Sequence, residues 1–104
     1  MQGKKALTER VTVQNVNVPG YTSTVAADKY HAARQALLQA LPAGPPGLTQ
    51  AEMMAAVLPY LPPELFPGGA KAGWWTKTAQ LDMEAKGELV RTQTKPLRWH
   101  RRGE

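Results

Sequence analysis

The residues of this chain whose types and spacing suggest chemistry are cations near its C-terminus. The chain carries a formal net charge of +5 and has an isoelectric point near 9.8, whereas residues 30–66 hold only one base and two acids. Positive charge concentrated in one stretch is typical of a surface that binds a polyanion, and the alternative is a solubilising tail. Between positions 91 and 102 there are five bases and no acid: Arg91, Lys95, Arg98, Arg101 and Arg102.

The helix expected just before this run has polar residues that suit the edges of bases. Gln80 can pair with adenine through its amide, Lys77 can bind a guanine or a phosphate, and Thr76 can contact a base or the backbone. The five C-terminal bases would then hold phosphates, which supplies affinity without sequence information. The alternative is a solvated helix face, and Glu84 on that face would repel phosphate.

A third candidate is the entry to the same helix. Gly68, Gly69 and Lys71 lie where free backbone amides and a cation at a helix N-terminus can hold an anion. The alternative is that the glycines only permit a tight turn.

Catalytic chemistry finds little support in the sequence. His31 and His100 are the only histidines, the chain has no cysteine, and the histidine spacing matches no metal-binding motif. Asp82 and Glu84 are two apart on a helix and point to different faces, so they are poor partners for acid–base work. We therefore expect no enzyme, no metal, no cofactor and no small-molecule substrate.

The composition indicates one ordinary folded domain. The chain has 104 residues, 42% of them hydrophobic and 20% charged, which predicts a single modest core. Neither a secretory signal nor a membrane-spanning segment is evident. With no cysteine, a cytoplasmic location is the simplest expectation.

Proline, glycine and apolar spacing predict the elements. Residues 1–26 are expected to form a flexible or extended arm, or a loose hairpin with a turn at Pro19-Gly20. Residues 27–104 are expected to form the domain, with helices over 27–41, from a capping box at Thr49 onward, and over 70–86. Gly87 should end the last helix, and two strands, 89–93 and 97–101, should follow.

The spacing also predicts which side chains are covered. On the last helix Trp74 should be mostly buried and Trp75 partly exposed, and Asp82 should pair with Lys86. In the final hairpin, Val90 should pair with Trp99 and Thr92 with Leu97, so that Arg91 faces Arg98.

Six short segments of the chain have a distinctive sequence: Gly47–Glu52, Leu65–Gly69, Gly73–Thr78, Gln80–Asp82, Glu84–Gly87 and Lys95–Arg101. In these segments the chain resembles a small bacterial family of unknown function. In element order it also resembles winged helix-turn-helix domains, which would imply an α+β fold, mostly helical, with the last helix as recognition helix and the basic hairpin as wing. The segment from Pro59 to Ala72 is longer and richer in proline than a simple helix-turn-helix turn.

Two functions follow as expectations. The first is non-enzymatic binding of nucleic acid, with duplex DNA favoured, through helix 73–86 and hairpin 88–102. The second is a protein-interaction or homodimerisation module that uses an exposed tryptophan together with Leu48, Leu65 and Phe66. No membrane partner is expected.

Overall fold

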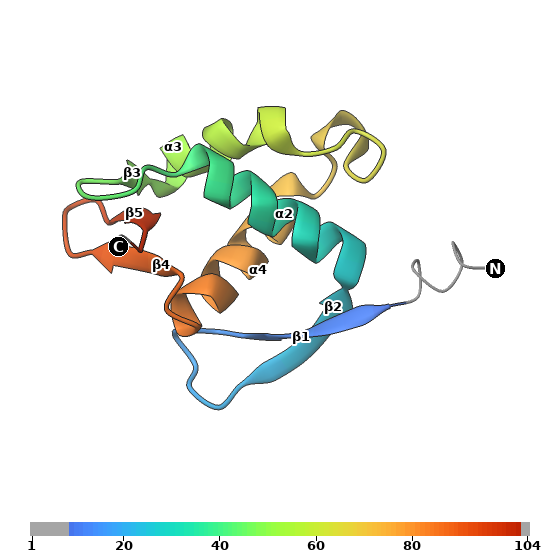
Figure 1. The fold of residues 1–104 in the computed structure, drawn as a ribbon, viewed down its shortest axis with the longest axis horizontal. Helices are drawn as coiled ribbons and strands as arrows, with labels where there is room; N and C mark the ends of the chain where they lie inside the picture. The colour runs from blue at the N-terminus through green and yellow to red at the C-terminus, as the bar shows by residue number, and fades with distance from the viewer. Residues whose placement is uncertain (1–8, 103–104) are drawn as a thin grey trace.

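A computed structural model of the protein describes residues 9–102. Within this range the chain is a mixed α/β fold with three α-helices and two small antiparallel sheets. Figure 1 shows α2 (Ala27–Ala40) crossing over α4 (Ala72–Ala85), with a β-hairpin below both and the second sheet beside the end of α4. Residues 1–8, most of the expected flexible arm, lie outside the described residues, as do residues 103–104.

The N-terminal hairpin is regular and belongs to the core. Strands β1 (Arg10–Gln14) and β2 (Thr22–Ala26) pair antiparallel. The connection closes with a turn at Pro19-Gly20, where Gly20 has φ 87°, as the proline–glycine pair predicts. Val13 and Val25 are buried in the same apolar cluster as the helices. The hairpin is therefore packed against the helices, not draped loosely over them.

The end of α2 and the start of the next helix lie where the sequence predicts. α2 ends before Pro42, which cannot continue a helix. α3 (Gln50–Val57) opens with the predicted capping box: the Glu52 N–H donates to Thr49 Oγ1 at 3.2 Å, and the Thr49 N–H donates to Glu52 Oε1 at 2.9 Å. These two bonds satisfy amides that the first turn would leave without partners.

A proline-rich segment joins α3 to α4. It contains two short 3₁₀ turns, η1 (Leu58–Tyr60) and η2 (Pro67–Gly69). Leu61 and Phe66 anchor the segment in the core, Phe66 being only 3% exposed. The prediction that Phe66 contributes to an exposed interaction surface is therefore wrong.

The orientation of α4 differs from the prediction. Trp74 is 56% exposed and Trp75 is 8% exposed, the reverse of what apolar spacing suggested. The buried side of α4 includes three polar residues, each with 0% exposure: Thr76, Gln80 and Asp82. The helix can bury Gln80 and Asp82 because other elements supply hydrogen-bond partners for both of them.

The end of α4 follows the prediction. Gly87 adopts φ 80° immediately after the helix. Its N–H donates to the Glu84 carbonyl at 3.1 Å, and the Glu88 N–H donates to the Met83 carbonyl at 2.8 Å. This pair of bonds is a Schellman motif, which turns the chain directly into the next strand.

The second sheet has the order β3-β5-β4 and contains β3 (Leu48–Thr49), β4 (Leu89–Thr92) and β5 (Arg98–Arg101). The predicted hairpin is present, but its register is shifted by one residue: Val90 pairs with His100, and Arg91 lies opposite Trp99. The predicted pairing of Arg91 with Arg98 is therefore wrong. The longer loop lets the Thr92 hydroxyl donate to the Arg98 carbonyl at 3.1 Å, directly across the ladder.

Candidate functional site

The polar side of α4, predicted to face nucleic acid, is occupied by other side chains. The buried Gln80 amide donates to Glu84 Oε2 at 3.3 Å and accepts from Gln50 Nε2 of α3 at 3.1 Å. Lys77 Nζ donates to the other end of the same Gln50 amide at 3.3 Å. Gln80 and the equally buried Thr76 expose no surface to a base in this arrangement, so the structure gives no support to their predicted roles as base contacts. Of the three predicted contacts on this side, Lys77 alone is exposed.

Arg91 and Glu84 form an ion pair beside this chain of contacts. Arg91 Nε donates to Glu84 Oε1 at 2.9 Å, and the Glu84 side chain is only 4% exposed. The one-residue shift in register also places the Arg91 guanidinium over the ring of Trp99, 5.5 Å from its centroid. Arg91 therefore neutralises a buried carboxylate, which leaves little of its charge for a phosphate.

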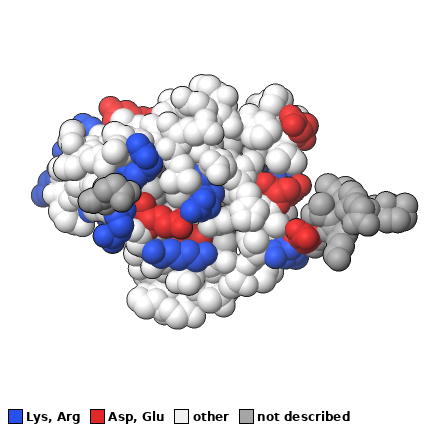
Figure 2. All heavy atoms as spheres, viewed as in Figure 1, with Lys and Arg blue, Asp and Glu red and all other residues white. Residues whose placement is uncertain are grey.

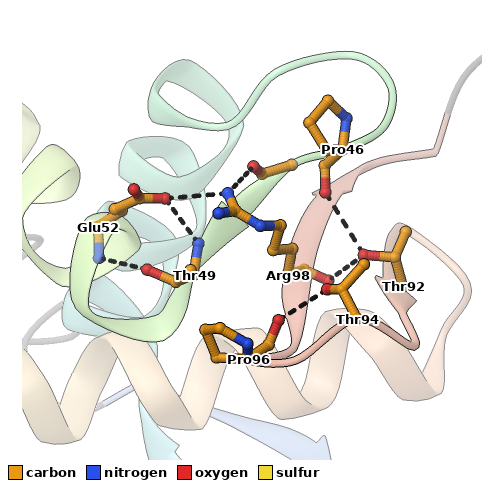
Figure 3. A network of polar contacts seen from close by, with 8 residues as sticks. Pro46, Thr49, Glu52, Thr92, Thr94, Pro96 and Arg98 are labelled. Atoms are coloured by element: carbon orange, nitrogen blue, oxygen red, sulfur yellow. Dashed lines mark hydrogen bonds and ion pairs between the residues drawn. The ribbon is translucent and has the colours of Figure 1, made fainter.

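Arg98 ties the final hairpin to the start of α3. Its guanidinium donates to the Gly47 carbonyl at 3.1 Å and contacts Glu52 Oε1 at 3.4 Å (Figure 3). The backbone N–H of Thr49, with a smaller contribution from Arg98, holds the pKa of the Glu52 carboxyl below its usual value. In the same view the Thr92 hydroxyl lies within hydrogen-bond distance of the carbonyls of Arg98 and Pro46, and the Thr94 hydroxyl donates to the Pro96 carbonyl of the hairpin loop.

The last two arginines fasten β5 to the helix ends. Arg101 Nε donates to the Leu41 carbonyl at the end of α2, at 3.0 Å. Arg102 Nε donates to the carbonyl of Gly87, just after α4. Neither arginine pairs with a carboxylate among residues 9–102, but the position of each is explained by its hydrogen bond to a backbone carbonyl.

The remaining two predicted cations are Lys71 and Lys95. Both are exposed, and neither side-chain ammonium has a hydrogen bond or an ion pair with residues 9–102. Lys71 precedes α4 in a left-handed conformation, φ 59°, and Lys95 belongs to the hairpin loop. Figure 2 shows basic and acidic groups interspersed on the face that it draws. The predicted cations therefore do not act as one unpaired set.

The most prominent apolar group on the described surface is Trp74, which the sequence interpretation placed in the core. A hollow of about 200 Å³ lies between α4 and the N-terminal hairpin, with Trp74, Leu81 and Tyr21 among its walls. A second hollow of about 350 Å³ is lined by Lys71, Trp74 and Trp75. Trp75 meets Trp74 edge to face, with ring centroids 4.9 Å apart, so a buried ring supports the exposed one. Hydrophobic spacing alone indicated the wrong tryptophan as the outward one.

Asp82 connects this surface to the core. Its buried carboxylate accepts from the backbone N–H of Gln14 in β1 at 2.8 Å, from the Tyr30 hydroxyl of α2, and from Lys86 Nζ at 3.0 Å. The pairing with Lys86 confirms the prediction. Burial, with the hydrogen bond to Asp82 and its charge, raises the pKa of Tyr30, so its hydroxyl remains a donor. One carboxylate therefore fixes β1 and α2 against α4.

Two further observations concern the described residues 9–102. They contain no cluster of three histidine or acidic side chains placed to hold a metal ion. None of their helices has the length and apolar character needed to cross a membrane.

The fold and surface thus define a small mixed α/β domain with an exposed tryptophan on its last helix. The chain belongs to DUF6958, a family of unknown function, whose model matches residues 10–99. This confirms the resemblance to a family without assigned activity. No curated protein matches the chain in sequence, and no solved structure matches it.

Proposed function

We propose that this chain is a non-enzymatic protein-interaction module whose binding surface is centred on Trp74. The observation that carries the proposal is the exposure of this ring, 56%, between two hollows and against a buried second tryptophan. Tryptophan in such a setting is the residue type that most often dominates the energy of a protein interface.

The free energy available from Trp74 supports this choice. A tryptophan can bury up to about 250 Å², so covering its exposed part would remove about 140 Å² from water and contribute about 3–4 kcal/mol. Its ring is held by Trp75, so little side-chain entropy is lost on binding. Tyr21, also about half exposed, lines the same hollow and extends the surface onto the hairpin.

We further propose a winged-helix arrangement, with α4 as the third helix and β4–β5 as the wing. The order helix, strand, helix, helix, hairpin supports it, as does the pairing of β3 with β5. In this arrangement the outward residues of α4 include Trp74, Lys77, Thr78 and Leu81, two of them apolar. A stripe with an exposed tryptophan and a single cation suits a protein surface better than a phosphate backbone.

Nucleic-acid binding remains a second candidate, supported by the net charge and by the exposed Lys71, Lys77 and Lys95. With Gln80 and Thr76 buried, such binding would rest on phosphate contacts and carry no base specificity. Three contacts would give a slope of about −2.7 in a plot of log affinity against log salt concentration. Titration of a labelled DNA duplex at several salt concentrations measures this slope.

Affinity capture tests the first proposal against the second. Immobilised wild-type chain, Trp74→Ala and a matched control, Leu58→Ala, are each incubated with extract from the source cells, with and without nuclease. Leu58 is 51% exposed on η1 and lines neither Trp74 hollow. We expect one protein to be retained by wild type and Leu58→Ala and lost by Trp74→Ala, whatever the nuclease treatment. Equal capture by Trp74→Ala, or capture abolished by nuclease, would refute the proposal.

A further inference from the structure

Strand β4 has an unpaired edge. It is the outer strand of the order β3-β5-β4. The Arg102 N–H donates to the Glu88 carbonyl at 3.0 Å, which marks the pair just before β4 as a hydrogen-bonded one. Because such pairs alternate in an antiparallel ladder, the backbone groups of Leu89 and Arg91 point away from β5. Within residues 9–102 no hydrogen bond reaches these outward groups.

A groove of about 390 Å³ runs along this edge. Its lining includes Leu89, Arg91 and Gln93 of β4 and its loop. Val16 and Asn17, from the β1–β2 connection, also line it. An added strand would lie about 4.8 Å from β4, inside this groove.

The edge lacks the usual protection against strand addition. Edge strands are commonly guarded by a projecting charge, a proline or a bulge. β4 contains one charged residue, Arg91, and its guanidinium is turned back to Glu84 and to the ring of Trp99. No side chain of β4 therefore projects a free charge across the edge.

The charges of the groove indicate the chemistry of its occupant. Its lining includes three charged residues, Glu84, Arg91 and Arg102. Glu84 and Arg91 neutralise each other, whereas Arg102 is exposed and has no carboxylate partner among the described residues. The groove therefore carries one uncompensated positive charge beside free backbone donors and acceptors.

We propose that β4 accepts an extended, acidic segment of a partner protein as an additional strand, with backbone hydrogen bonds to Leu89 and Arg91 and a carboxylate at Arg102. Main-chain pairing would supply affinity and the acid would supply selectivity. This surface is separate from the Trp74 surface, and neither proposal depends on the other.

A tethered strand tests the proposal on the full chain. A six-residue segment of alternating valine and glutamate is fused after Glu104 through a Gly/Ser linker of about 12 residues, which spans about 19 Å on average and raises the local concentration to the millimolar range. Hydrogen exchange of single backbone amides is then followed by NMR. We expect the Leu89 and Arg91 amides to exchange at least about tenfold more slowly than in the untethered chain. The amides of Val90 and Thr92, which face β5, serve as internal controls.

Charge variants complete the design. A fusion with lysine in place of glutamate should protect the two amides less, and Arg102→Glu should abolish the protection given by the acidic fusion. Arg10→Glu is the matched control, because Arg10 is exposed on the N-terminal hairpin and does not line the groove. Unchanged exchange at Leu89 and Arg91 in the acidic fusion would overturn the proposal, as would equal protection by the lysine fusion.

Discussion

Replacing Asp82 by alanine should destabilise the protein more than any other single loss of a polar side chain in the described region. The change removes the acceptor of three donors at once: the Gln14 N–H, the Tyr30 hydroxyl and Lys86 Nζ. Each of the first two donors would be left unsatisfied, at about 1–3 kcal/mol. Lys86 is partly exposed and can return to water, so its ion pair contributes less than about 1 kcal/mol.

The expected total for Asp82→Ala is about 3–5 kcal/mol, a large part of the roughly 5–15 kcal/mol that holds a small domain together. Asp82→Asn keeps one acceptor oxygen and should cost about 1–2 kcal/mol. Lys86→Ala, the matched control for the ion pair alone, should cost less than about 1 kcal/mol. Urea unfolding followed by circular dichroism gives the three values.

A local measurement separates this explanation from a general loss of stability. In Asp82→Asn, exchange of the Gln14 amide and of the Val16 amide, which donates to Leu81 on α4, should increase before the helices open. If Asp82→Ala lost less than about 1 kcal/mol, or if the Gln14 amide kept its protection, the assignment of Asp82 as the anchor of β1 would be refuted.

Three further predictions follow from the structure. Trp75→Ala should lower the free energy of unfolding in urea by about 3–5 kcal/mol, because Trp75 is buried, and Trp74→Ala should lower it by less than about 1 kcal/mol. Similar losses in the two variants would contradict the orientation of α4. Gly47→Ala should lower the free energy of unfolding by about 2–3 kcal/mol more than Gly20→Ala does. Both glycines have positive φ, but only at Gly47 would an added Cβ lie 2.3 Å from a carbonyl oxygen of β5. Equal losses in the two variants would show that the added Cβ meets no steric clash at Gly47. The lowered pKa of Glu52 means that its contribution to stability is present above the ordinary glutamate pKa and is lost as the pH falls through the lower folded value. Glu52→Gln should therefore reduce the loss of stability between about pH 5 and pH 3. The free energy of unfolding in urea, measured across this pH range, checks this, and an equal loss in wild type and variant would contradict it.

The parts of the fold that could be predicted from sequence depend on neighbouring residues. The capping box at Thr49, the stop at Pro42 and the left-handed Gly87 each act within a few residues, so their physics is contained in a short stretch of chain. The turn at Pro19-Gly20 is of the same kind. These features define where the elements begin and end.

The parts that could not be predicted depend on partners far away in the chain. Which face of α4 is buried is decided in part by Gln50, Tyr30 and the backbone of Gln14, which provide hydrogen-bond partners for Gln80 and Asp82 on that face. A prediction from apolar spacing assigns glutamine and aspartate to the exposed face of a helix. It therefore placed Gln80 outside and Trp74 inside. The hairpin register could not be predicted for a related reason. The sequence suggested a symmetric turn, whereas the observed loop places Arg91 where it contacts both Glu84 and Trp99.

The same difference between local and distant information changes what the net charge means. Counted along the chain, the run from 91 to 102 contains five bases and no acid. In space, Glu84 and Glu52 come from helices earlier in the chain and pair with Arg91 and Arg98, which leaves three of the five bases without a carboxylate partner among the described residues. Charge composition therefore overstates the affinity of this surface for a polyanion, because an arginine that already balances a carboxylate releases few counterions on binding. The exposed aromatic ring of Trp74 and the edge of β4 need no such correction, since Trp74 is 56% exposed and no hydrogen bond within residues 9–102 reaches the outward backbone groups of β4.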